Sequence, residues 1–226
     1  MSRLAVVVAL FSAISAAAFD MRSLETKNSA NILLGYQSLS ADWDPCTSAA
    51  AIGMNINYTL PGWPIGAEFG VMYSRASALV YRFVDTSTTS PIDNKYDMVC
   101  DFTEWHLGLY KYFQLGKSNF HLFLGGGGVY FQASVGMGYG NPFTGDPSDP
   151  VSAFDDALSG YVHGGIFYEI DSYRSVENYL VGIDVRMRFG APTLTLGWDE
   201  VLEQAIPDHE KDGTAITVAL ITGLLF

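Results

Sequence analysis

The stretch that decides the fold is Thr214-Ala-Ile-Thr-Val-Ala-Leu-Ile-Thr-Gly-Leu-Leu-Phe226. It carries no charge and no proline, and every second residue from Ile216 onward is large and apolar except Thr222. A period of two is typical of a β-strand whose two faces meet different surroundings. Because both faces are largely apolar, we expect this strand to pair with a neighbour along each edge, away from water.

Seven further strand-like segments precede this stretch, and their connections alternate between two kinds. The expected strands span 31–39, 50–60, 65–83, 98–115, 120–140, 158–170, 178–197 and 214–226. Connections after the second, fourth and sixth strands are short, whereas those after the first, third, fifth and seventh are long and acidic. This sorting predicts an all-β fold, an eight-stranded antiparallel up-and-down transmembrane β-barrel with its turns at one end and its loops at the other.

The two faces of several strands differ in a way that favours lipid outside and polar side chains inside. In 178–197 one face carries Val181, Ile183, Val185, Met187 and Phe189, and the other carries Asp184, Arg186 and Arg188. In 120–140 an apolar face consists of Phe123, Val129, Phe131, Ala133, Val135 and Met137. We assign these apolar faces to the lipid-facing exterior.

The composition excludes several classes of protein. The chain has 24 Asp and Glu against 12 Lys and Arg, a net charge of -12, so nucleic acid is not an expected partner. Beyond the first residues there is no apolar run of the roughly 18 residues that a membrane helix needs. The aromatic content of 14% and the 23 glycines suit strands broken by turns and bulges.

The first residues have the layout of a secretory signal peptide. Arg3 supplies a basic start, residues 4–14 are apolar, and Ala16-Ala17-Ala18 offers small residues for cleavage. We therefore divide the chain into a signal peptide (1–18), a short periplasmic N-terminal segment (19–30) and an outer-membrane β-barrel (31–226).

Four charged residues within the expected strands are predicted to form an ion-pair network in the barrel lumen: Glu104, Asp184, Arg186 and Arg188. Buried charges need partners, and an eight-stranded barrel is just wide enough for side chains to meet across it. His106, Tyr110, Asn55 and Gln132 are expected nearby. We interpret the network as a structural plug, and the alternative is a gate or narrow polar channel.

Three residues at the long-loop end raise further expectations. Cys46 lies in the first long loop and Cys100 at the upper end of the fourth strand, and an even cysteine count in an exported chain favours a disulfide. Two buried free thiols are the alternative. Arg75 shares an outward face with aromatic residues near the outer headgroups, where it pairs with a lipid phosphate or simply extends its charge to water.

The acidic residues of the long loops have two interpretations. Carboxylate oxygens suit divalent cations, but they also keep a solvated surface from aggregating. None of these loops has the spacing of an EF-hand, so we predict no metal site and no cofactor.

Taken together, the chain resembles the small eight-stranded outer-membrane barrels, the group of the OmpA barrel, OmpX, OmpW and the opacity proteins. The resemblance rests on the strand layout, on the glycine-rich strand Phe123-Leu-Gly-Gly-Gly-Gly-Val-Tyr-Phe131, and on the last strand. There Val218, Leu220, Leu224 and Phe226 match the signal by which such barrels are recognised for assembly. The resemblance implies a bacterial outer-membrane location, with membrane lipid, lipopolysaccharide and the barrel-assembly machinery as partners.

The sequence supports three hypotheses about function. The first is a structural or surface-interaction role with a lumen closed by side chains and no enzymatic activity. The second is an OmpW-like conduit for a small apolar ligand, with Pro192 either weakening the wall of the seventh strand or marking the end of that strand above the membrane. The third is a lipid A-modifying enzyme, but His163 lacks the serine two positions on that such deacylases carry, and nothing brings Asp101, His106 and Ser77 together.

Overall fold

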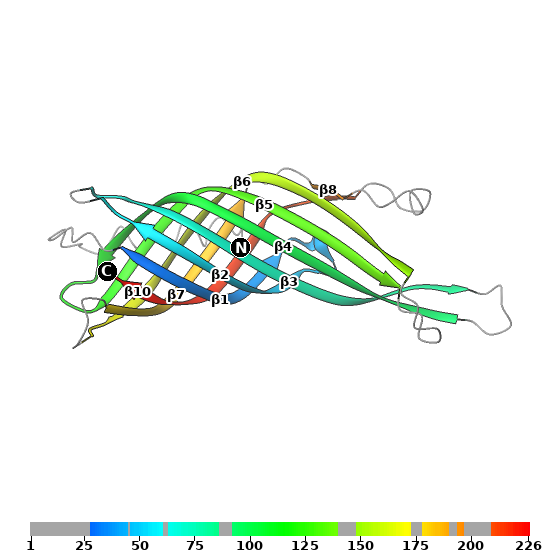
Figure 1. Ribbon diagram of the computed structural model, residues 1–226, viewed down its shortest axis with the longest axis horizontal. Helices are drawn as coiled ribbons and strands as arrows, with labels where there is room; N and C mark the ends of the chain where they lie inside the picture. The colour runs from blue at the N-terminus through cyan, green and yellow to red at the C-terminus, as the bar shows by residue number, and fades with distance from the viewer. Residues whose placement is uncertain are drawn as a thin grey trace, which may run out of the picture.

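The computed structural model describes residues 28–44, 46–60, 63–85, 92–139, 148–172, 178–189, 194–196 and 209–226. Eight strands form a closed barrel in the order β1-β10-β7-β6-β5-β4-β3-β2 (Figure 1). Their bounds are β1 Ser29–Leu39, β2 Ser48–Tyr58, β3 Gly66–Asp85, β4 Ile92–Gln114, β5 Phe120–Tyr139, β6 Ser148–Ile170, β7 Asn178–Phe189 and β10 Ala215–Leu225. The predicted eight-stranded antiparallel up-and-down barrel is confirmed.

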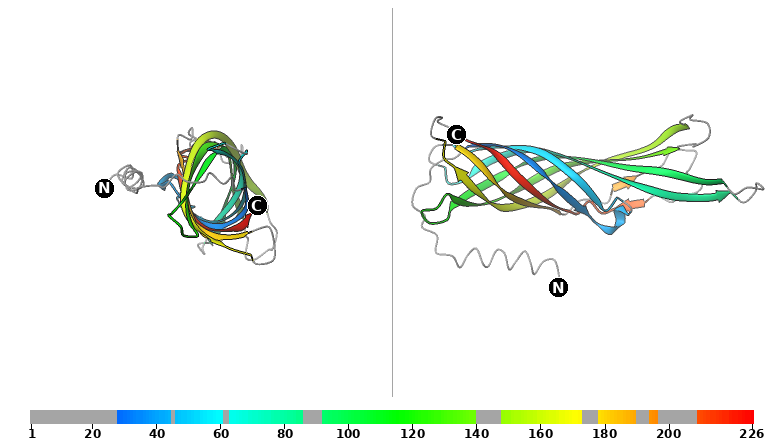
Figure 2. Two further views of the ribbon diagram at one scale, coloured as in Figure 1. Left: turned by 90° about the vertical axis from the view of Figure 1, so that its left-hand side faces the viewer. Right: turned by 90° about the horizontal axis from the view of Figure 1, so that it is seen from below.

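The last strand closes the barrel. β10 pairs antiparallel with β7 on one edge and with β1 on the other, for example at Leu220↔Ile183 and Leu220↔Leu34. Seen end-on, the strands form an unbroken ring (Figure 2, left). Every strand therefore has a hydrogen-bonded neighbour on both sides over the closed part of the wall, as a membrane-spanning sheet requires.

Several strand limits differ from the expected ones. β6 begins at Ser148, ten residues earlier than expected, because this polar segment continues the ladder with β5, as at Ala153↔Val135. β7 ends at Phe189 rather than near 197, because its ladder with β6 stops at Gly160↔Phe189. A separate two-stranded sheet joins β8 (Leu194–Leu196) to β9 (His209–Lys211). Pro192 lies outside the described residues.

The strands fall into two length classes. β3 to β6 have 20 to 23 residues, whereas β1, β2, β7 and β10 have 11 or 12. About 9 to 11 residues suffice for a strand to cross a membrane. One side of the barrel thus rises well beyond the rim of the other (Figure 2, right). Much of what the sequence suggested as long second and third loops is strand, including Asp93 and Asp156.

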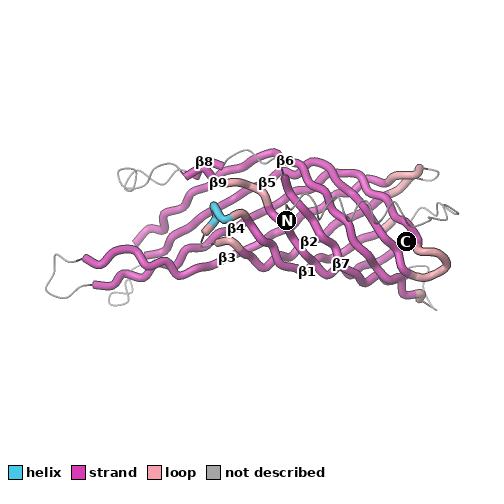
Figure 3. The backbone as a smooth tube through the Cα atoms, turned by 180° about the vertical axis from the view of Figure 1, so that it is seen from behind, coloured by secondary structure: helices cyan, strands magenta, loops and turns pink. Residues whose placement is uncertain are grey.

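The connections at the opposite end are compact. The β4–β5 turn closes with the Leu115 amide donating to the Phe120 carbonyl at 3.0 Å, and Gly116 adopts a positive φ of 63° that suits glycine. At the rim with the longer strands, the β1–β2 connection contains the short 3₁₀ helix η1 (Ala41–Trp43) (Figure 3). Short turns face the periplasm in barrels of this kind, so the taller rim lies on the cell exterior.

Side chains alternate between the lumen and the outer surface along every strand of the closed wall. The outer face exposes large apolar residues such as Leu107 (68%), Leu220 (63%) and Ile52 (53%), whereas Glu68, Glu104, Asp184 and Arg188 are buried inside. A water-soluble barrel would show the opposite distribution. No helix in the described ranges has the length and hydropathy to cross a membrane.

Candidate functional site

The middle of the lumen holds a cluster of charged residues, here called the lower ion cluster, made of Glu68, Tyr161, His163, Asp184 and Arg186. Arg186 Nε donates to Asp184 Oδ2 at 2.8 Å, and its Nη1 donates to Glu68 Oε1 at 3.3 Å. His163 lies between the two carboxylates, with Nε2 3.2 Å from Glu68 and Nδ1 3.2 Å from Asp184. The hydroxyl of Tyr161 donates to Glu68 at 3.0 Å. Every charge in the cluster thus has an opposite charge within reach, as buried charges require.

A second group, the upper ion cluster, lies nearer the outer rim around Glu104. Arg188 Nη1 and Gln37 Nε2 donate to Glu104 Oε1, the latter at 2.5 Å, and His106 Nε2 lies 3.1 Å from Oε2. Arg188 also donates from Nε to the Gly213 carbonyl at 2.5 Å. The ring of Tyr161 meets the ring of His106 edge-on at 4.8 Å, which joins the two clusters into one column.

All four residues of the predicted lumen network are buried in the lumen, but they do not form one network. Glu104 pairs with Arg188 and Asp184 pairs with Arg186, so the four residues lie in two clusters. The residue that completes the lower cluster, Glu68, was not among the predicted ones. The alternation of Glu68 with the outward Phe69 and Val71 is the signal that could have identified it. Tyr110 and Asn55 face the lumen as expected.

Gln132 does not face the lumen, and the face assignment of its whole strand was wrong. Phe123, Val129, Phe131, Ala133 and Val135 are buried inside, which leaves Gln132 on the outer surface. Neither face of this strand carries Asp, Glu, Lys or Arg, so alternation of charged residues could not orient it. Phe131 packs beneath Arg188, whose guanidinium carbon lies 3.5 Å from the ring centre, a cation–π contact.

Apolar clusters lie above and below the two ion clusters. The lower apolar cluster, near the periplasmic end, contains Leu33, Phe123, Phe167, Leu180, Ala219, Ile221 and Leu225. Between it and the lower ion cluster is a cavity of about 10 Å³, bordered by Asn31, Asn55, Tyr112 and Asp184 among others. That volume is close to the minimum that holds one water molecule.

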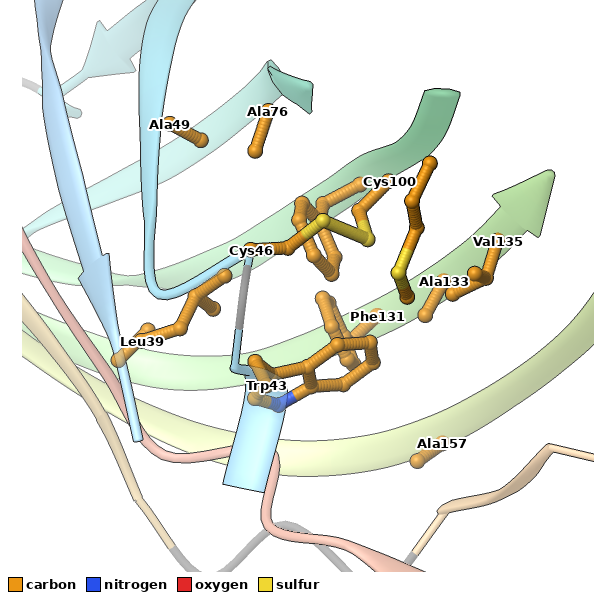
Figure 4. Close-up of a cluster of buried hydrophobic side chains, with 13 residues drawn as sticks. Leu39, Trp43, Cys46, Ala49, Ala76, Cys100, Phe131, Ala133, Val135 and Ala157 are labelled. Carbon is orange, nitrogen blue, oxygen red and sulfur yellow. A yellow bond between two sulfur atoms is a disulfide. The ribbon is translucent and has the colours of Figure 1, made fainter. Parts of the chain in front are cut away.

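The mouth cluster occupies the outer end of the lumen. Its members are Leu39, Trp43, Cys46, Ala49, Ala76, Met98, Cys100, Phe102, Phe131, Ala133, Val135, Ala157 and Ala215 (Figure 4). Trp43 meets Phe102 edge-on at 4.9 Å and donates from Nε1 to the Asp212 carbonyl at 2.7 Å. The β1–β2 connection is thereby held to the last loop across the mouth.

The two cysteines are joined within this cluster. The Cys46 and Cys100 Cα atoms lie 6.3 Å apart and a disulfide connects their sulfur atoms (Figure 4). Cys46 belongs to the β1–β2 connection, and Cys100 faces inward from β4 between Ala76 and Val135 of the neighbouring strands. The bond thus ties η1 to the taller wall.

The outer surface changes character at the taller rim. Arg75 is exposed, with Nε 3.6 Å from Asp101 Oδ1, and the hydroxyl of Tyr73 donates to the same carboxylate. Tyr130 likewise donates to Asp156. Of the predicted assembly residues, Val218, Leu220 and Phe226 are exposed to the outside and Leu224 partly so.

The candidate catalytic residues do not gather. Asp101 and Ser77 lie on the outer surface, whereas His106 is buried in the lumen with Glu104. His163 is enclosed by the lower ion cluster. Among the described residues, no group of three or more His, Cys, Asp or Glu is arranged to hold a metal ion. Most acidic residues of the fourth loop lie outside the described residues.

A closed antiparallel barrel with an apolar outer belt and a charged interior is the construction of bacterial outer-membrane proteins. The chain is an outer-membrane β-barrel protein of the small, eight-stranded type, with a belt of apolar side chains on its outer face. The predicted class and location are confirmed.

Neither models of known protein families nor curated sequences match the chain. Among solved structures, a major outer membrane protein from Thermus thermophilus is similar, with 12% identity, a TM-score of 0.49 and coverage of 89% of this chain and 100% of that one. Ail, the attachment invasion locus protein of Yersinia pestis, shows 11% identity and a TM-score of 0.48, covering 90% and 100%. Neisserial surface protein A shows 10% identity and a TM-score of 0.43, covering 89% of this chain and 97% of that one. Likeness at this distance concerns the fold only.

Proposed function

We propose that this protein is a barrel with a lumen closed by its own side chains, serving a structural or surface-interaction role without catalysis. The observation that supports closure best is the contact between Arg186 and Glu68. These residues belong to β7 and β3, which lie opposite each other in the ring of eight strands. A direct ion pair across the diameter leaves no continuous aqueous path at that level.

Two further contacts span the lumen closer to the mouth. Gln37 of β1 and Arg188 of β7 both reach Glu104 of β4, three strands away in either direction. Apolar side chains also fill part of the lumen above and below these contacts, and they give a passing ion nothing in place of its water shell. The ion clusters therefore act as a plug, and their charges are balanced by partners rather than by transported ions.

Conductance in planar lipid bilayers tests this proposal. The wild-type barrel should give no steady single-channel openings, because an ion would have to displace paired charges in both ion clusters. Regular openings of constant size in the wild-type protein would overturn closure.

If the network were a gate instead of a plug, one substitution would have a different effect. A gate at the upper ion cluster predicts a large conductance increase in Glu104→Ala, whereas a plug with the lower ion cluster intact predicts none. Asp101→Ala is the matched control, since Asp101 lies on the same strand but faces outward. A conductance increase confined to Glu104→Ala would replace the plug with the gate.

The partners we propose follow from the outer surface. Arg75 lies at the upper limit of the apolar belt, where its exposed guanidinium can pair with a phosphate of lipid or lipopolysaccharide in exchange for Asp101. The outward row Val218, Leu220, Leu224 and Phe226 is proposed as the contact with the barrel-assembly machinery.

The conduit for a small apolar ligand and the lipid A-modifying enzyme gain no support from the described residues. The weakened wall of the conduit depended on Pro192, which lies outside them. The enzyme would need Asp101, His106 and Ser77 on one side of the wall, and they lie on two. A negative liposome-uptake assay and unchanged lipid A mass spectra after expression are the results expected here.

A further inference from the structure

The disulfide of the mouth cluster is sealed from solvent. Cys46 is 1% exposed and Cys100 is 0% exposed, and Trp43 of the same cluster, whose carbonyl accepts a hydrogen bond from the Cys46 amide, is 1% exposed. Phe102 and Phe131, which belong to the same cluster, stack with their ring centres 5.9 Å apart. A reagent that exchanges thiols for disulfides must bring its own sulfur into contact with a cysteine sulfur. Among the described residues of the barrel, the burial of both cysteines leaves neither sulfur open to such an approach.

The bond also lies on the far side of the membrane from the periplasm. Cys100 is fourteen residues from Gln114, the last residue of β4 at the short-turn end. That distance is about 46 Å of strand, or about 35 Å in height at a tilt near 40°. The apolar band of such barrels is only about 25 Å tall. In the inserted protein the two sulfur atoms are therefore beyond the reach of a periplasmic protein.

We propose that the Cys46–Cys100 bond is made in the periplasm, by exchange with an exported disulfide-carrying oxidant, before the barrel closes. One cysteine thiolate attacks the oxidant disulfide and forms a mixed disulfide, releasing one oxidant thiol. The second cysteine thiolate displaces the other oxidant sulfur. The chain loses two electrons and two protons, and the oxidant leaves as a dithiol.

The covalent topology permits this order of events. The two cysteines are 54 residues apart, a separation that spans β2, β3 and the upper part of β4. A flexible chain of this length brings its ends together much faster than thiol exchange proceeds. The linked hairpins can then enter the barrel with η1 already attached to the wall that it covers.

The test compares oxidation before and after folding. The full chain is dissolved in urea with reductant, and one half is exposed to oxidised glutathione while unfolded. The other half is first folded in detergent micelles, verified by its mobility shift on boiling, and then exposed to the same oxidant. Free thiols are counted over time with a maleimide that changes gel mobility.

The expected result is rapid bond formation in the unfolded chain and at least about 100-fold slower oxidation of the folded, reduced barrel. A reduced chain that fails to fold until it has been oxidised would support the same order, because the bond would then be a condition of closure. The proposal is overturned if the folded, reduced barrel oxidises within a few fold of the unfolded rate. It is also overturned if the unfolded chain cannot form the intramolecular bond.

Two tryptophan variants show whether the mouth cluster is the barrier. Trp43→Ala removes the largest side chain of the mouth cluster around the bond, so the folded, reduced variant should react with maleimide many times faster than the wild type. Trp63→Ala is the matched control, since Trp63 is 60% exposed near the periplasmic turns. Equal reactivity in both variants and the wild type would contradict the assigned barrier.

Discussion

At the scale of single residues, Glu68 connects more partners than any other carboxylate of the lower ion cluster. It receives hydrogen bonds from Arg186, Tyr161 and the Asn55 side-chain amide, the last at 3.3 Å, and faces His163. A buried guanidinium that loses one of two carboxylates retains a desolvation cost that is no longer offset. Glu68 is thus the residue on which the balance of lumen charge depends.

Replacement of Glu68 by alanine should destabilise the folded barrel by about 3 kcal/mol, the low end of the range for a broken buried pair, because Asp184 still contacts Arg186. Urea unfolding in lipid vesicles measures the change. Asp101→Ala, which removes a partly exposed carboxylate from the outer surface, should stay within about 1 kcal/mol of wild type. Equal midpoints for Glu68→Ala and wild type would contradict the role given to the cluster.

The sequence identified which residues carry charge inside the wall but not how they pair. Glu104, Asp184, Arg186 and Arg188 were placed on inward faces because each alternates with apolar neighbours. Pairing depends on how far each strand is shifted against the next around the ring, and that shift is not encoded in any one strand. The predicted orientation of Phe131 was wrong for another reason. Its strand has no Asp, Glu, Lys or Arg on either face to mark the side that faces the lumen.

At the scale of elements, β10 combines two faces with different tasks. Leu225 is 3% exposed and packs in the lower apolar cluster, whereas the adjacent Phe226 is 55% exposed to the outside. One residue contributes to stability through burial, and the other is available to a partner before or during insertion. Adjacent positions thus separate a buried contact from the surface that we propose for recognition.

Phe226→Ala should lower the amount of protein assembled in cells several fold while leaving refolding in detergent near wild type. Leu225→Ala should instead lower the stability of the refolded protein, by about 2 to 3 kcal/mol, because it removes a buried side chain. Gel-shift assays on membranes and on refolded protein measure both. An assembly defect of the same size in both variants would argue that Phe226 acts only through stability.

The projecting hairpin of β3 and β4 should be dispensable for closure. β2 pairs with β3 only up to Ala50↔Arg75, so residues beyond that point do not contribute to the closed ring. Replacing residues 79–97 by an Asn-Gly turn keeps the pair Ala78↔Met98 and suits a two-residue hairpin. The shortened protein should still show the boiling-dependent mobility shift, and loss of that shift would show that the projection takes part in folding.

At the scale of the whole molecule, a closed sheet of this kind should resist detergent until it is heated. We expect the unboiled, folded protein to migrate differently from the boiled one on denaturing gels, with β-type circular dichroism in detergent. The reason is that every strand of the ring has partners on both edges, so no strand can detach first. A protein that is monodisperse without detergent and shows no shift would refute the membrane assignment.

Strand number, closure and the sorting of connections were predictable because they depend on patterns spread over the whole chain. How far each strand extends beyond the closed ring was not predictable. Residues 148–157 contain three aspartates and a proline, the composition of a loop, yet they pair with β5 up to Tyr139↔Ser148. Tertiary pairing with a neighbouring strand outweighed the local preference there.

The polarity of the wall reverses along β4. Below Thr103 its outer side chains are apolar, as Trp105 and Leu107 are, and its inner ones are ionic or polar. Above that level Asp101 faces outward, while Phe102 and Cys100 are buried inside. The upper part is thus built like a water-soluble protein, and unfolding there moves the apolar groups of the mouth cluster from a dry interior into water, as it does those of the smaller lower apolar cluster. Side chains of the lower belt that remain in lipid contribute little to such transfer. The heat capacity increment of unfolding should therefore come mainly from the mouth cluster and the lower apolar cluster and be small for a chain of this length.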